Sequence, residues 1–93
     1  MRIGVLTVRF ALPGCRSLKE KRQRLGGLRE RFGRHTNVAV IESNHADAHQ
    51  HAEWSFVAAA QSLQLVDRTL AELEAKIIES VDAQVLDVAR EMI

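Results

Sequence analysis

Residues 17–22 read Ser-Leu-Lys-Glu-Lys-Arg, and this stretch both starts a helix and opens the most basic part of the chain. Ser17, followed three residues later by Glu20, is typical of a capping box. In this motif the serine hydroxyl accepts a hydrogen bond from the amide three residues on, and the glutamate bonds back to the serine amide. Apolar residues then recur at helical spacing and form one stripe: Leu18, Leu25, Leu28 and Phe32. The pattern predicts a helix from Ser17 to about Arg34.

Alternating apolar residues before and after this helix predict four β-strands. The first covers residues 1–12, and every second residue in it is apolar and assigned to the core: Leu6, Val8, Phe10 and Leu12. The other three strands are expected at residues 37–44, 51–61 and 83–93, with a polar loop at 45–50. A second helix is expected from residue 63 to about 79, because its apolar residues are spaced by three and four: Leu63, Val66, Leu70, Leu73 and Ile77.

The resulting order is βαββαβ, made of two strand-helix-strand units. This order predicts an α+β, ferredoxin-like sandwich in which one four-stranded antiparallel sheet carries both helices on one face. With 93 residues, 46% of them hydrophobic and 27% charged, the chain is expected to be a single domain, residues 1–93. No stretch has the length of a membrane helix or a signal sequence, and the single cysteine fits a reducing compartment. We therefore expect a cytoplasmic protein that does not bind membranes.

The net charge of +1 hides a strong asymmetry along the chain. Residues 1–34 contain ten of the 13 Lys and Arg residues but two of the 12 Asp and Glu residues, a net charge of +8. Residues 35–93 contain the remaining three basic and ten acidic residues, a net charge of −7. A basic segment of this kind is a candidate surface for a polyanion.

Four basic residues at the first helix form the candidate nucleic-acid-binding site: Arg16, Lys19, Arg22 and Arg29. The last three lie on one flank of the apolar stripe, with Gly26 and Gly33 between them, so that a phosphate backbone could approach the helix closely. Two glycines at 26 and 27 are unfavourable within a helix, by about 1 kcal/mol each. We read this pair as tolerated, as a point of local bending, or as room for the close approach of a partner.

The alternative interpretation is that this basic row is neutralised inside the molecule. Asp67 and Glu74 lie on a flank of the second helix, and both helices pack on the same face of the sheet, so the two rows of charge could compensate each other. Lys21 is a separate case, because it lies on the apolar stripe itself. A lysine there must extend to solvent or find a carboxylate, and Glu42, in the second strand, is the predicted partner.

No group of residues predicts catalysis, and no cofactor is expected. The loop and the start of the third strand contain potential metal ligands at every second position, His45, Asp47, His49 and His51, but their spacing fits no known zinc motif, and we expect no bound metal. Cys15 precedes a helix beside a basic residue, an environment that lowers a thiol pKa. Without a second cysteine or a neighbouring histidine it is interpreted as an incidental loop cysteine.

The face of the sheet away from the helices is predicted to be unusually apolar. It would carry Ile3, Val5, Thr7, Ile41, Val57 and Ala59. The aromatic residues Phe10, Trp54 and Phe56 have the core parity instead, so stacking of RNA bases on an open sheet face, as in the RRM, is not expected. An apolar open face favours a homodimer or a protein partner.

The hexapeptide at 17–22, the Asn37-Val38-Ala39-Val40 segment, and His45 with Asp47 resemble the YlxP-like family of small bacterial proteins. The resemblance covers essentially the whole chain. It implies a ferredoxin-like fold without an established activity, and members are often encoded beside translation-initiation and ribosome-maturation factors. The leading hypothesis is therefore a non-enzymatic protein that binds RNA or a ribosomal particle through the first helix. The alternative is a structural homodimer or adaptor that uses the open face of the sheet.

Overall fold

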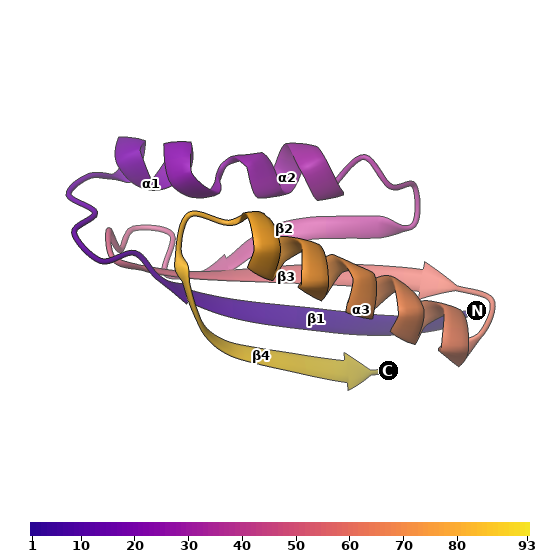
Figure 1. Ribbon diagram of the computed structural model, residues 1–93. Helices are drawn as coiled ribbons and strands as arrows, with labels where there is room; N and C mark the ends of the chain where they lie inside the picture. The colour runs from indigo at the N-terminus through magenta and orange to yellow at the C-terminus, as the bar shows by residue number, and fades with distance from the viewer.

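The computed structural model describes residues 1–93 and contains one sheet and three helices (Figure 1). In chain order the elements are β1 (Arg2–Ala11), α1 (Leu18–Leu25), α2 (Gly27–Phe32), β2 (Val38–Asn44), β3 (His51–Ala60), α3 (Leu63–Ser80) and β4 (Gln84–Met92). The strands lie in the order β2-β3-β1-β4, and every neighbouring pair is antiparallel. The α+β architecture predicted from the order of elements is confirmed and is consistent with a ferredoxin-like arrangement. None of the helices is both long and apolar enough to cross a lipid bilayer.

The first helical region differs from its prediction, because it is two helices and not one. The break falls at Gly26, which ends α1 and precedes α2. The backbone at Gly26 stays in the right-handed helical region, and its amide bonds to the carbonyl of Arg22 at 2.6 Å. A Cβ added at Gly26 would collide with that carbonyl oxygen, whereas one at Gly27 would meet nothing within 4 Å. The interruption is therefore a local bend that only glycine accommodates at position 26.

The start of α1 confirms one half of the capping box and corrects the other. The amide of Glu20 donates to the hydroxyl of Ser17 at 3.1 Å, as expected. The carboxylate of Glu20, however, accepts from the amide of Arg16 at 2.8 Å and not from the amide of Ser17. The glutamate thus fixes the residue before the cap and with it the direction from which the loop enters the helix.

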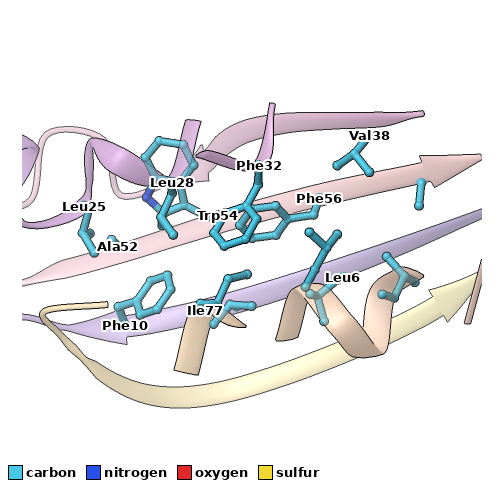
Figure 2. Packing of buried hydrophobic residues seen from close by; sticks show 14 of the residues in the cluster. Leu6, Phe10, Leu25, Leu28, Phe32, Val38, Ala52, Trp54, Phe56 and Ile77 are labelled. Carbon is cyan, nitrogen blue, oxygen red and sulfur yellow. The ribbon is translucent and has the colours of Figure 1, made fainter. Parts of the chain in front are cut away.

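A single cluster of 17 buried residues fills the space between the sheet and the helices (Figure 2). The predicted core side of β1 is confirmed, since Leu6, Val8, Phe10 and Leu12 are all fully buried. Trp54 and Phe56 of β3 lie on the same side of the sheet, and Phe56 makes an edge-to-face contact with Phe32 of α2, with ring centroids 6.1 Å apart. The aromatic residues therefore serve the core and leave the opposite face of the sheet without a stacking platform.

The opposite face of the sheet has the predicted parity. Ile3 pairs with Ala59, and Val5 pairs with Val57, while Ile41 of β2 is 52% exposed. Further along the strands this face becomes polar, through a chain of hydroxyl contacts and a carboxylate: Thr7, Ser55, Ser43 and Glu53. Polar side chains thus interrupt the apolar area of the open face, since Ile41 lies opposite Ser55.

Candidate nucleic-acid interface

Lys21 of α1 is a buried cation at the centre of the candidate interface. It is 3% exposed, and its Nζ lies 3.2 Å from Oε2 of Glu42, the partner predicted from the sequence. The same Nζ donates to the carbonyls of His45 at 2.7 Å and Ala48 at 2.9 Å. An ammonium group has three hydrogens, so these three acceptors satisfy it. Lys21 therefore ties α1 to β2 and to the β2–β3 loop, and its charge is not offered to a ligand.

A cavity of about 200 Å³ lies directly beside this ion pair. The helical region contributes Lys21, Arg22, Gly26 and Arg29 to its lining, and the sheet contributes Glu42 and Trp54. Two of the predicted basic site residues, Arg22 and Arg29, are thus brought together around one opening, although they lie on different helices. Gly26 is the predicted glycine between them, and its lack of a side chain leaves the space open.

Trp54 forms the wall of the cavity on the side of the sheet. Its side chain lies between β3 and the helical segments, on the same side as Leu25 and Leu28 (Figure 2). The guanidinium carbon of Arg29 lies 5.6 Å from the centroid of the Trp54 ring, which is a cation–π distance. This contact positions the Arg29 side chain at the cavity without a carboxylate partner.

The remaining predicted site residues, Arg16 and Lys19, are exposed at the start of α1 and do not line the cavity. None of the four predicted basic residues takes part in an ion pair. The ion pairs of the molecule join Lys21 to Glu42, Arg24 to Asp82, and Arg90 to two carboxylates. We call Arg16, Lys19, Arg22 and Arg29 the basic surface. Gly33, predicted to lie among them, caps α2 instead and lies outside the cavity.

Two acids on the flank of α3 are paired with a residue that the sequence interpretation missed. Arg90 of β4 contacts Asp67 and Glu74, each at 3.1 Å. The expectation that these two acids compensate the basic row of the first helix is therefore wrong. A signal was present in the sequence. Arg90 lies two residues from both Val88 and Met92, so it is on the same face of the strand as these two residues, which pack against the core. Alternation in the last strand places this arginine beside α3.

The histidines around the β2–β3 loop do not form a metal centre in the structure. His45 and His51 approach each other, with ring centroids 6.2 Å apart. No three His, Cys, Asp or Glu side chains lie close enough together to hold a metal ion. His45 has a positive φ of 60°, and its amide donates a hydrogen bond to Oδ1 of Asn44 at 2.8 Å. These features are those of a tight turn that presents the His45 carbonyl to Lys21.

Cys15 lies in the loop before α1, as predicted, but it belongs to the hydrophobic core. It is 1% exposed, and its thiol donates to the carbonyl of Ser17 at 3.4 Å. Glu20 accepts the amide hydrogen bond of Arg16, and this contact, with a smaller influence from the nearby Cys15 thiol, lowers the pKa of Glu20 below the ordinary value of 4.5. The segment before α1 is therefore fixed by the buried Cys15 side chain and by the hydrogen bond between Arg16 and Glu20. These contacts fix the backbone from which the exposed basic residues of α1 extend.

A model of a protein family described as having unknown function, DUF503, matches residues 3–90 of this sequence. The chain belongs to the DUF503 family. No curated protein matches the sequence. In this DUF503 protein the matched residues span all three helices, nearly all of the sheet and the whole of the cavity lining, so the features described above belong to the family domain.

Proposed function

We propose that this DUF503 protein is a non-enzymatic protein that binds RNA or a ribosomal particle through the basic surface. The observation that carries the proposal is that all four cations are exposed and have no carboxylate partner, while the acids of α3 are engaged by Arg90. Unpaired cations on one surface attract phosphates, and neutralising phosphates releases condensed counterions. The uneven distribution of charge along the chain supports the same reading.

The bend at Gly26 gives a steric reason for phosphate binding at this surface. It removes side-chain bulk between Arg22 and Arg29, and both arginines line the same cavity. An arginine fork matches phosphate oxygens well, and Arg29 is already positioned by the Trp54 ring. The geometry therefore favours a phosphate held between two guanidinium groups over a diffuse electrostatic attraction.

The experiment compares salt titrations of RNA binding for the native chain and for the variant Lys19→Gln/Arg22→Gln/Arg29→Gln. For single strands we expect the salt slope to fall by roughly 0.7 for each phosphate that the variant no longer neutralises, with weaker binding at every salt concentration. The control is Arg68→Gln/Lys76→Gln, which removes two exposed cations from α3 and should leave binding unchanged. Unchanged co-sedimentation of the triple variant with ribosomal particles would overturn the proposal.

The resemblance of residues 17–22 to the YlxP-like pattern supports the choice of RNA over other polyanions. We propose that within DUF503 the chain belongs with the YlxP-like proteins, which are often encoded beside translation-initiation and ribosome-maturation factors. A partner in translation also implies a cytoplasmic protein, which agrees with the use of one cysteine that forms no disulfide.

A second candidate function is a homodimer or protein adaptor, and the open face of the sheet favours it. Ile3, Val5, Val57 and the half-exposed Ile41 form an apolar area that no element of the chain covers. Pairing with a symmetric copy would bury it. Val5→Lys should then convert a dimer into a monomer with unchanged helicity. Sedimentation equilibrium showing the native chain as a monomer at roughly tens of micromolar, where a standard interface holds, would exclude the dimer.

A further inference from the structure

All three helices lie on one face of the sheet, and no element of the chain covers the other face (Figure 1). Leu6, Val8 and Phe10 of β1 are fully buried beneath the helices, so the residues that alternate with them belong to the open face. The strand register continues this parity into β2 and β3. A contiguous group of apolar side chains on the open face, called the apolar band here, consists of Ile3, Val5, Ala39, Ile41, Val57 and Ala59.

The apolar band runs diagonally across three strands. Val5 of β1 is opposite Val57 of β3, which in turn is opposite Ala39 of β2. Ile41 extends the band from Ala39 toward one end of the sheet, in the row of Thr7 and Ser55. Ile3 extends it from Val5 toward the other end, in the row of Ala59. An apolar strip of this shape suits one helix lying across the sheet, in the way that helices cover the opposite face.

Acidic residues border the apolar band. Glu91 of β4 is directly opposite Val5, and it is exposed. Further along β1, Arg9 lies between Glu53 of β3 and Asp87 of β4, which are opposite it in the two registers. All four charged residues are on the open face, because residues opposite each other in a sheet share a face. Arg9 is the one Lys or Arg of this face, so three carboxylates against one guanidinium leave a net charge of −2.

The charge of the open face favours a partner of opposite charge over a second copy of the chain. A symmetric copy would bring the same net negative charge against this face, and like charges placed together across an interface are unfavourable. Glu91 would be the most affected, because covering Val5 removes water from the carboxylate beside it. A partner with cations at the edge of its apolar surface covers the same side chains and pairs with the acids.

We propose that the open face binds an amphipathic helix of another protein, with Lys or Arg on the flanks of that helix. Its apolar side lies on the apolar band, and its cations lie beside Glu53, Asp87 and Glu91. The inference names the partner of the adaptor alternative. It goes beyond RNA binding, because it uses the face of the sheet opposite the helices that carry the basic surface. The chain can therefore hold RNA on one side and a basic protein segment on the other.

The probe is a dye-labelled peptide of Leu and Lys, about five helical turns long, in which Leu forms one stripe. Its binding to the native chain is followed by fluorescence anisotropy. We expect saturable binding that weakens about tenfold or more for Val5→Lys, which puts a cation into the apolar band. The nearly isosteric variant Asp87→Asn/Glu91→Gln should also weaken binding and flatten its salt dependence. The matched control Glu72→Gln/Glu79→Gln removes two exposed carboxylates from α3 and should leave binding unchanged.

A second peptide, with Glu in place of every Lys, tests the sign of the charge. It should not bind the open face, so any binding it shows should be the same for the native chain and Val5→Lys. The inference is overturned if the Leu/Lys peptide does not bind saturably, or if Asp87→Asn/Glu91→Gln binds it as well as the native chain does. Sedimentation equilibrium that shows a native dimer and a monomeric Val5→Lys would overturn it too, because a second copy would then occupy the face.

RNA binding distinguishes this inference from the proposed function. Val5→Lys and Asp87→Asn/Glu91→Gln should keep the affinity for RNA and its salt slope, because the basic surface lies on the other side of the sheet. If RNA binds and the Leu/Lys peptide does not, the inference is wrong and the proposed function stands. If the peptide binds as expected and RNA does not, the proposed function fails and the inference stands.

Discussion

The α1–α2 region and α3 occupy equivalent places in the two strand-helix-strand units, yet they are built differently. α3 is one helix of 18 residues that buries Val66, Leu70, Leu73 and Ile77, and Arg90 forms ion pairs with two acids on its flank. The α1–α2 region is broken at Gly26, buries a lysine, lies over a cavity and keeps its exposed cations unpaired. Helix propensity, core packing and charge pairing agree in α3, whereas the α1–α2 region departs from each of them.

This difference separates the part of the chain that stabilises the fold from the part that is available for binding. Sequences generally satisfy propensity, packing and charge pairing together, and departures concentrate at functional sites. Here a helix-breaking glycine, a buried cation and unpaired arginines all occur at one cavity. Their coincidence is the physical basis for placing function at α1–α2 and not at α3.

The largest expected effect tests how the two regions are anchored. Lys21→Ala removes the cation from Glu42 and leaves the carbonyls of His45 and Ala48 without their donor. Breaking a buried pair in this way should lower the free energy of unfolding by about 3–5 kcal/mol. The reference in α3 is Leu70→Ala, expected to cost about 2–5 kcal/mol through a cavity in the core. Urea unfolding followed by far-ultraviolet circular dichroism measures both decreases in stability.

A double variant shows whether charge is the cause. Lys21→Met/Glu42→Leu leaves no buried charge unpaired, so it should recover part of the stability that Lys21→Ala removes. Recovery is incomplete because the two loop carbonyls still lack a donor. A cost for Lys21→Ala below that of an ordinary surface substitution would mean that α1 is held by its apolar stripe alone.

The fold was predictable from the sequence because its signals are local and repeated. Alternation in the strands and the spacing in α3 each depend on residues close together in the chain. The Lys21–Glu42 pair was predictable as well, since a lysine on an apolar stripe needs a carboxylate and few were suitably placed. Arg90 was missed because its partners become neighbours only when β4 pairs with β1 beside α3.

The cavity was also beyond sequence reasoning, for a similar reason. It depends on the register that places Glu42 opposite Trp54. It also depends on the bend at Gly26, since Arg22 and Arg29 lie on different helices and still line the same cavity. The glycine pair was noticed, but propensity alone does not distinguish a tolerated glycine from a required one. Only the clash predicted for a Cβ at position 26, and the open space at position 27, decide between these readings.

The next prediction uses that glycine pair as a matched comparison within the α1–α2 region. Gly26→Ala should destabilise the chain by about 1–3 kcal/mol, because the new Cβ meets the carbonyl of Arg22 and the helix must shift. Gly27→Ala should instead stabilise it by about 0.4–1 kcal/mol, because the unfolded chain loses freedom and the folded chain has space. Thermal unfolding of both variants shows whether each substitution raises or lowers the stability of the chain. Two stabilising substitutions would mean that the bend at Gly26 is not required.

The smallest effect concerns the N-termini of α1 and α3, which differ in their response to pH. The carboxylate of Glu20 accepts from the Arg16 amide, and the first turn of α3 contains no acid. Because this contact lowers the pKa of Glu20, the stability it contributes is present above the ordinary value of 4.5 and disappears as the pH falls through the folded value. Native chain and Glu20→Gln should therefore differ at pH 7 and converge in acid, in urea titrations at stepped pH. Ser62→Ala, which removes the cap of α3, should cost the same at each pH; a difference for Glu20→Gln that stays constant down to acid pH would assign the effect to packing and not to charge.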